Sequence, residues 1–89
     1  MIKHYNIFLS GKVQGVGFRY YTKMKAQELK ITGFVKNKAD RSVYIEAEGE
    51  EENLIEFLKW CEQGPVQAYV SSMNHSESPP NHFIDFDIR

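Results

Sequence analysis

KHYNIFLSGKVQGVGFRYYTKMKAQEL, residues 3–29, runs from an alternating pattern through a glycine-rich turn into a helical pattern. Apolar side chains at every second position predict a half-buried strand over residues 3–9. After the glycines, side chains share one face at spacings of four, four and three, which predicts a helix over about residues 20–30. The residues on that face are Phe18, Thr22, Ala26 and Leu29.

The rest of the chain continues with the same two patterns. Further strands are predicted over residues 31–37, 42–48, 66–73 and 82–89, with a turn at 38–41 and a loop at 76–81. A second helix is predicted from an apolar stripe at helical spacing, and Gly64 followed by Pro65 ends it. The stripe consists of Leu54, Phe57, Leu58 and Cys61.

The resulting order of elements, β-α-β-β-α-β followed by a terminal strand, is typical of a ferredoxin-like α+β sandwich. We expect an antiparallel sheet of about four or five strands with two helices on one face, in a single domain over residues 1–89. This fold carries enzymes, regulatory modules and RNA-binding domains, so the fold class alone does not decide the function.

Composition narrows the class of protein. The chain is 42% hydrophobic and 26% charged, as in ordinary globular proteins, and has neither a membrane-spanning run nor a signal peptide. Because no membrane-spanning run is present, we expect no membrane partner. The single cysteine excludes an internal disulfide, so we expect a cytoplasmic protein. Residues 1–41 hold nine Lys and Arg against Glu28 and Asp40, a charge of +7, so the remainder carries −8. If folding gathers these basic residues on one side, that side attracts anions; the alternative is two ordinary solvated faces, and charge alone does not distinguish them.

The glycine turn is a candidate anion site. Gly15 and Gly17 can adopt positive φ and bring the backbone close to a ligand. Amides in such a turn bind phosphate together with a helix N-terminus, and the planar guanidinium of Arg19 adds a cation. The sequence matches neither a Walker loop nor the dinucleotide fingerprint, and a lone glycine-rich turn is more often purely structural.

Two segments carry a resemblance to a known family. GKVQGVGFR (residues 11–19) and GFVKNKAD (33–40) resemble the two signatures of the acylphosphatases. FLKWCEQGP (57–65) is similar to the end of the second helix in bacterial members. The resemblance implies a hydrolase that cleaves acyl phosphates to a carboxylate and inorganic phosphate, without metal or other cofactor.

The resemblance also implies a set of site residues. The loop would hold the phosphoryl group through backbone amides, Arg19 would be the phosphate-binding cation, and Asn37 would orient the attacking water. The expected partners are a small acyl phosphate as substrate and inorganic phosphate as product or inhibitor, with the protein acting as a monomer. The expected loop residues are Gln14, Gly15, Val16, Gly17, Phe18 and Arg19.

Two positions depart from the family pattern. Arg41 stands where the family commonly has glycine after Asp40, and Lys30 stands where glycine often ends the first helix. If the hairpin requires positive φ at Arg41, a non-glycine residue there costs about 1 kcal/mol. Because that hairpin begins at Asn37, the orientation of the Asn37 amide is what this departure affects.

Two other functions are compatible with the fold. One is a non-catalytic anion-binding module or a carrier-domain relative that assists a larger carbamoyl-phosphate enzyme. The other is RNA recognition, which requires paired aromatic residues on the first and third strands. Tyr44, Glu46 and Glu48 face outward on the third strand, and these acids would repel a nucleic-acid backbone. We therefore expect no nucleic-acid partner, and the three widely spaced histidines suggest no metal site.

Overall fold

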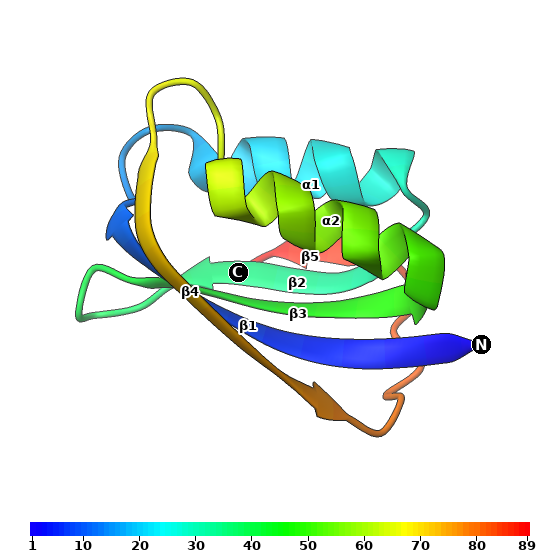
Figure 1. Ribbon diagram of the computed structural model, residues 1–89. Coiled ribbons are helices and arrows are strands. Elements are labelled where there is room, and N and C mark those ends of the chain that lie inside the picture. Colours follow the sequence, from blue (N-terminus) through cyan, green and yellow to red (C-terminus); the bar gives the residue numbers. More distant parts are fainter.

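Five strands and two helices alternate along the computed structural model, which describes residues 1–89 (Figure 1). In chain order they are β1 (Ile2–Lys12), α1 (Phe18–Glu28), β2 (Thr32–Asn37), β3 (Val43–Glu50), α2 (Glu51–Gln63), β4 (Tyr69–Ser78) and β5 (Phe86–Ile88). The strand order is β4-β1-β3-β2-β5, with antiparallel pairs except for β5, which runs parallel to β2. The predicted ferredoxin-like α+β fold is therefore confirmed.

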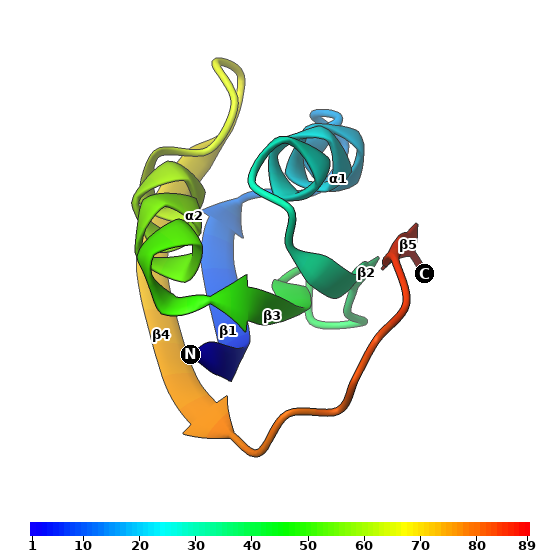
Figure 2. The same cartoon turned by 90° about the vertical axis from the view of Figure 1, so that its right-hand side faces the viewer.

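Both helices pack on the same face of the sheet, and the linker between β4 and β5 passes on the opposite side (Figure 2). Phe18 of α1 and Phe57 of α2 meet Ile45 of β3 in one buried core. Fully burying a large apolar side chain contributes about 1.5–3 kcal/mol, so the two apolar helix stripes fix both helices to this face. The other face of the sheet has no helix on it, and we call it the helix-free face.

The predicted bounds are wrong at the last two strands. β4 begins at Tyr69 and continues to Ser78, so the first three residues of the predicted loop at 76–81 are part of the strand. β4 is an edge strand, where polar residues stay in contact with water, and Asn6 of β1 donates to the hydroxyls of Ser76 at 3.5 Å and Ser78 at 2.5 Å. These polar contacts hold a strand that has no apolar alternation. β5 is shorter than residues 82–89.

The two departures from the family pattern both have left-handed backbone. Arg41 has φ 74° and Lys30 has φ 57°. In the β2–β3 turn the carboxylate of Asp40 accepts hydrogen bonds from the amide and hydroxyl of Ser42, at 3.0 and 2.5 Å, and these bonds lower the pKa of Asp40. The turn thus tolerates arginine at a position that favours glycine.

Candidate functional site

The glycine turn leaves a run of backbone amides without acceptors in the protein. Gly15 and Gly17 both have φ 74°, and Gly17 is the N-cap residue of α1 without a side-chain cap. Tyr21 is the first residue of this region whose amide donates to a backbone carbonyl, that of Gly17 at 3.1 Å. The N–H groups of residues 14–20 donate to no backbone carbonyl. Unsatisfied amides at a helix N-terminus form a ready site for an anion.

Most residues of this turn line a hollow of about 220 Å³, which we call the Arg19 hollow. Its walls come from the glycine turn, the first turn of α1, the end of β2 and the last residue of β5. The lining residues are Val13, Gln14, Gly15, Gly17, Phe18, Arg19, Tyr20, Asn37 and Ile88. The fold thus brings Asn37 to the same hollow as the turn, although about twenty residues separate them in sequence.

Arg19 is the only charged side chain among the nine that line the hollow. Its guanidinium is exposed, and Nη1 donates to the carbonyl oxygen of Arg89 at 3.4 Å. An arginine stays protonated at all ordinary pH values and presents a planar set of donors. No carboxylate or imidazole lines the hollow, so the walls offer one fixed positive charge, free amides and no general base.

Asn37 contributes an acceptor on the β2 side. It is the last residue of β2, paired with Val43 of β3, and its Oδ1 atom is buried without a hydrogen-bond partner in the protein. A buried amide oxygen without a donor is destabilising, by about 1–3 kcal/mol. Asn37 lines the hollow, and its unpaired oxygen is suited to accept a hydrogen bond from a water molecule or a ligand there.

Gln14 connects the two halves of the hollow through its side chain. Its Nε2 atom donates to the carbonyl oxygens of Lys38 and Ser42, each at 2.9 Å. Sequence reasoning assigned only the backbone of Gln14 to the site, because no local signal reveals a bond across 24 and 28 residues. Val13, Tyr20 and Ile88 also line the hollow and were missed, Ile88 because it reaches the hollow only through the pairing of β5 with β2.

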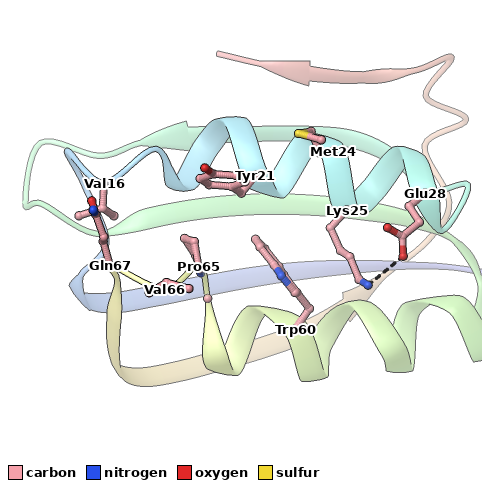
Figure 3. Close-up of a pocket in the computed structure, with 10 residues that line it drawn as sticks. Val16, Tyr21, Met24, Lys25, Glu28, Trp60, Pro65, Val66 and Gln67 are labelled. Carbon is pink, nitrogen blue, oxygen red and sulfur yellow. Dashed lines mark hydrogen bonds and ion pairs between the residues drawn. The ribbon is translucent and has the colours of Figure 1, made fainter.

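Val16 is the one expected loop residue that does not line the Arg19 hollow. It borders instead a larger groove of about 650 Å³ between α1 and α2 (Figure 3). Tyr21 and Trp60 extend into this groove from the two helices, and Lys25 is paired with Glu28 at 3.0 Å. The groove lacks a convergent set of free donors, so the Arg19 hollow is the better candidate site.

Comparison with known proteins agrees with this geometry. Residues 5–88 match the family model for acylphosphatases. The chain belongs to the acylphosphatase family. The acylphosphatase of Pseudothermotoga lettingae is 48% identical over 82 residues, covering 92% of each chain. The crystal structure of acylphosphatase from Bacillus subtilis is similar with a TM-score of 0.95 and 38% identity, covering 100% of this chain and 99% of that one.

This chain is also similar to one domain of a much longer protein, HypF. Full-length HypF, in a phosphate- and nucleotide-bound crystal structure, matches with a TM-score of 0.89 and 29% identity. The match covers 100% of this chain and 12% of HypF. A similar domain therefore forms a small part of the longer HypF chain. No helix here is long and apolar enough to span a bilayer.

Proposed function

We propose that the chain hydrolyses the carboxyl–phosphate bond of small acyl phosphates and releases a carboxylate and inorganic phosphate, as the name of its family describes. The observation that carries this proposal is the Arg19 hollow. Arg19 and Asn37, whose Oδ1 atom has no partner, line the same space as all residues of the free-amide turn except Val16. Those groups are the ones that binding a phosphoryl group and positioning a water require.

The turn and Arg19 bind the phosphoryl oxygens in this proposal. Phosphoryl transfer spreads negative charge over the three equatorial oxygens, and fixed donors aimed at them stabilise the transition state. The amides of Gly15 and Gly17 are held by the backbone, so they need no reorganisation during the reaction. The N-terminus of α1 adds a favourable dipole at the same point.

Asn37 orients the attacking water. Its amide oxygen accepts a hydrogen bond from water but cannot take up a proton. The leaving carboxylate is stable without protonation near neutral pH, so no general acid is required. Because it is such a good leaving group, the attacking water needs no strong base either. The water's proton passes to a phosphoryl oxygen of the substrate, the phosphorus–oxygen bond to the carboxylate breaks, and the new bond joins the water oxygen to phosphorus. The residues of the hollow contribute position and charge, and the reaction as proposed uses no metal ion or cofactor.

The proposal includes the state and partners of the enzyme. We propose a cytoplasmic monomer in which the buried thiol of Cys61 stays reduced. Burial raises the pKa of this thiol, which further reduces its reactivity. Inorganic phosphate, as the product, occupies the same hollow and competes with the substrate. Residues 1–89 act as one acylphosphatase domain.

Phosphate release tests the proposal directly. The purified chain is assayed with acetyl phosphate, benzoyl phosphate and p-nitrophenyl phosphate, an ordinary ester, in the presence of EDTA. We expect turnover of both anhydrides and little release from the ester, with competitive inhibition by phosphate. Equal rates on the ester, or turnover that EDTA abolishes, would contradict the proposed chemistry.

The likeness to a domain of HypF supports a second candidate, a non-catalytic module that binds an anion for a larger enzyme. With that function, phosphate would bind in the hollow, but the protein would not hydrolyse acyl phosphates. Isothermal titration with phosphate, run beside the release assay, separates the two functions: binding without turnover indicates the module.

A further inference from the structure

Two aromatic rings lie side by side on the helix-free face of the sheet. Phe8 of β1 and Tyr44 of β3 are register partners, and their ring centroids are 4.9 Å apart. β1 and β3 are neighbouring interior strands of the sheet. Phe8 is 41% exposed. The core on the helix side is complete without these rings, so their placement on the open face is not explained by packing against a helix.

Each ring has a lysine over its face, so a base that stacks there takes the place of the ammonium group. The Nζ atom of Lys38 lies 5.8 Å from the centroid of Phe8, and that of Lys36 lies 5.9 Å from the centroid of Tyr44. Neither lysine forms a salt bridge. Both are exposed at their strand or turn positions and free to meet an anion. We call these four residues the Phe8–Tyr44 patch.

The two acids on the same face are engaged by groups of the protein, Glu46 directly beside Tyr44 and Glu48 further along β3. Glu46 bonds to His4 Nε2 at 2.9 Å and accepts the Tyr44 hydroxyl at 2.7 Å. Burial and this bond to Glu46 raise the pKa of Tyr44, so the phenol stays neutral. Glu48 is 4% exposed and accepts hydrogen bonds from the amides of Asn81 and Phe83 in the linker between β4 and β5.

We propose that the Phe8–Tyr44 patch binds single-stranded nucleic acid, with bases stacked on the two rings and phosphates held by the two lysines. Aromatic rings interleaved with unpaired cations on an open sheet are a sequence-tolerant platform for unstacked bases. The stripe of uncharged polar residues on β4 that flanks Phe8, including Asn74, has room for contacts with sugar or base edges. A duplex keeps its bases stacked on one another and therefore cannot use the rings.

The site is distinct from the Arg19 hollow, so it does not depend on the proposed hydrolase activity. None of the four patch side chains lines the hollow. The lysines contact about two phosphates, which predicts a salt dependence of log K on log salt with a slope of about −1.4 for a single strand. Binding is therefore strongest at low ionic strength.

Fluorescence anisotropy with labelled ten-nucleotide oligo(U) and oligo(dT), at low salt and with saturating phosphate, tests the site. Two variants alter the patch, Phe8→Leu and Lys36→Gln. Their matched controls on the helix side are Tyr21→Leu, whose ring is 47% exposed, and Lys59→Gln. Stacking one base is worth about fivefold or more in affinity, so Phe8→Leu should weaken binding at least about fivefold. Lys36→Gln should reduce the salt slope by about 0.7.

Support requires that oligo(U) and oligo(dT) both bind in the presence of phosphate, that the patch variants weaken this binding, and that the control variants do not. Circular dichroism of each variant shows whether its fold is kept. The proposal is overturned if the wild type shows no binding, if the helix-side controls weaken it equally, or if phosphate displaces the strand more than sodium chloride does at the same ionic strength. Equal affinity for a duplex, or for a polyglutamate peptide of the same charge, would also overturn it by indicating a general polyanion surface.

Discussion

Gln14 and Ser42 are joined by a hydrogen bond of 2.9 Å from the side-chain Nε2 to the backbone carbonyl oxygen, although 28 residues separate them. The same nitrogen donates to the carbonyl of Lys38. One side chain therefore attaches the glycine turn to both sides of the β2–β3 hairpin, immediately after Asn37. The separation between the amides that bind phosphate and the amide that positions water is set by this contact.

Replacing Gln14 by leucine tests this coupling. Leucine keeps the bulk but donates no hydrogen bond, so the hairpin and Asn37 are free to shift relative to the turn. A misplacement of about 1 Å in a catalytic geometry costs about 100-fold in rate, so we expect kcat to fall about 10- to 100-fold. The inhibition constant for phosphate should change little, because the backbone amides of the turn remain. A loss of phosphate binding as large as the loss of kcat would show that the turn itself had collapsed.

Arg19 carries the only charge in the hollow, and its removal should affect the chemistry far more than the fold. Arg19→Ala is expected to lower kcat/KM for benzoyl phosphate more than about 100-fold, since a preorganised donor is worth about 10²–10³ in kcat. The side chain is exposed, so the free energy of unfolding should stay within about 0.5 kcal/mol of wild type. Lys59→Ala, which removes a positive charge from α2, is the matched control. Full activity of Arg19→Ala would end the assignment of the hollow.

Asn37 should affect the rate more than it affects binding. In Asn37→Ala the oriented acceptor is lost, so kcat falls while the inhibition constant for phosphate stays within about threefold. Asn37→Asp places a negative charge beside the phosphoryl group, so phosphate binding weakens as well. Steady-state kinetics with phosphate as inhibitor separates the two effects. Equal losses of kcat and of phosphate affinity in the alanine variant would instead indicate a binding role.

Arg41 has a strained backbone that glycine would relieve. Left-handed φ costs a non-glycine residue about 1–2 kcal/mol, and glycine returns about 0.5–1 kcal/mol of this as extra freedom in the unfolded chain. Arg41→Gly should therefore raise the free energy of unfolding by about 0.5 kcal/mol or more, measured by urea denaturation. Arg41→Ala, which retains the strain, should not be stabilised. A loss of stability in the glycine variant would show that the arginine side chain contributes contacts of its own.

The sequence reveals this fold wherever the pattern of burial is local. The helix stripes ending at Leu29 and Cys61 and the alternation at Ile7 are visible because one face of each element is buried against the core. The turn around Gly15 is visible because only glycine tolerates its φ without strain.

Features that depend on pairing between distant segments are not visible in the sequence. β4 extends to Ser78 through contacts with Asn6, and Ile88 reaches the hollow because β5 pairs in parallel with β2. The neighbouring rings of Phe8 and Tyr44 follow from the register of β1 and β3, which no local pattern specifies.

Glu48 fastens the β4–β5 linker to the sheet, and this contact makes stability depend on pH. Burial alone would raise the pKa of Glu48, but the amides of Phe83, Asn81 and His82 and the nearby His4 hold it below its ordinary value. A carboxyl whose pKa is lower in the folded state stabilises the fold above its unfolded pKa, and this stabilisation is lost as pH falls through the folded value. Unfolding free energies of wild type and Glu48→Gln, measured from about pH 7 to pH 3, should therefore converge on acidification. A difference that stays constant over this range would show that the carboxylate charge does not hold the linker.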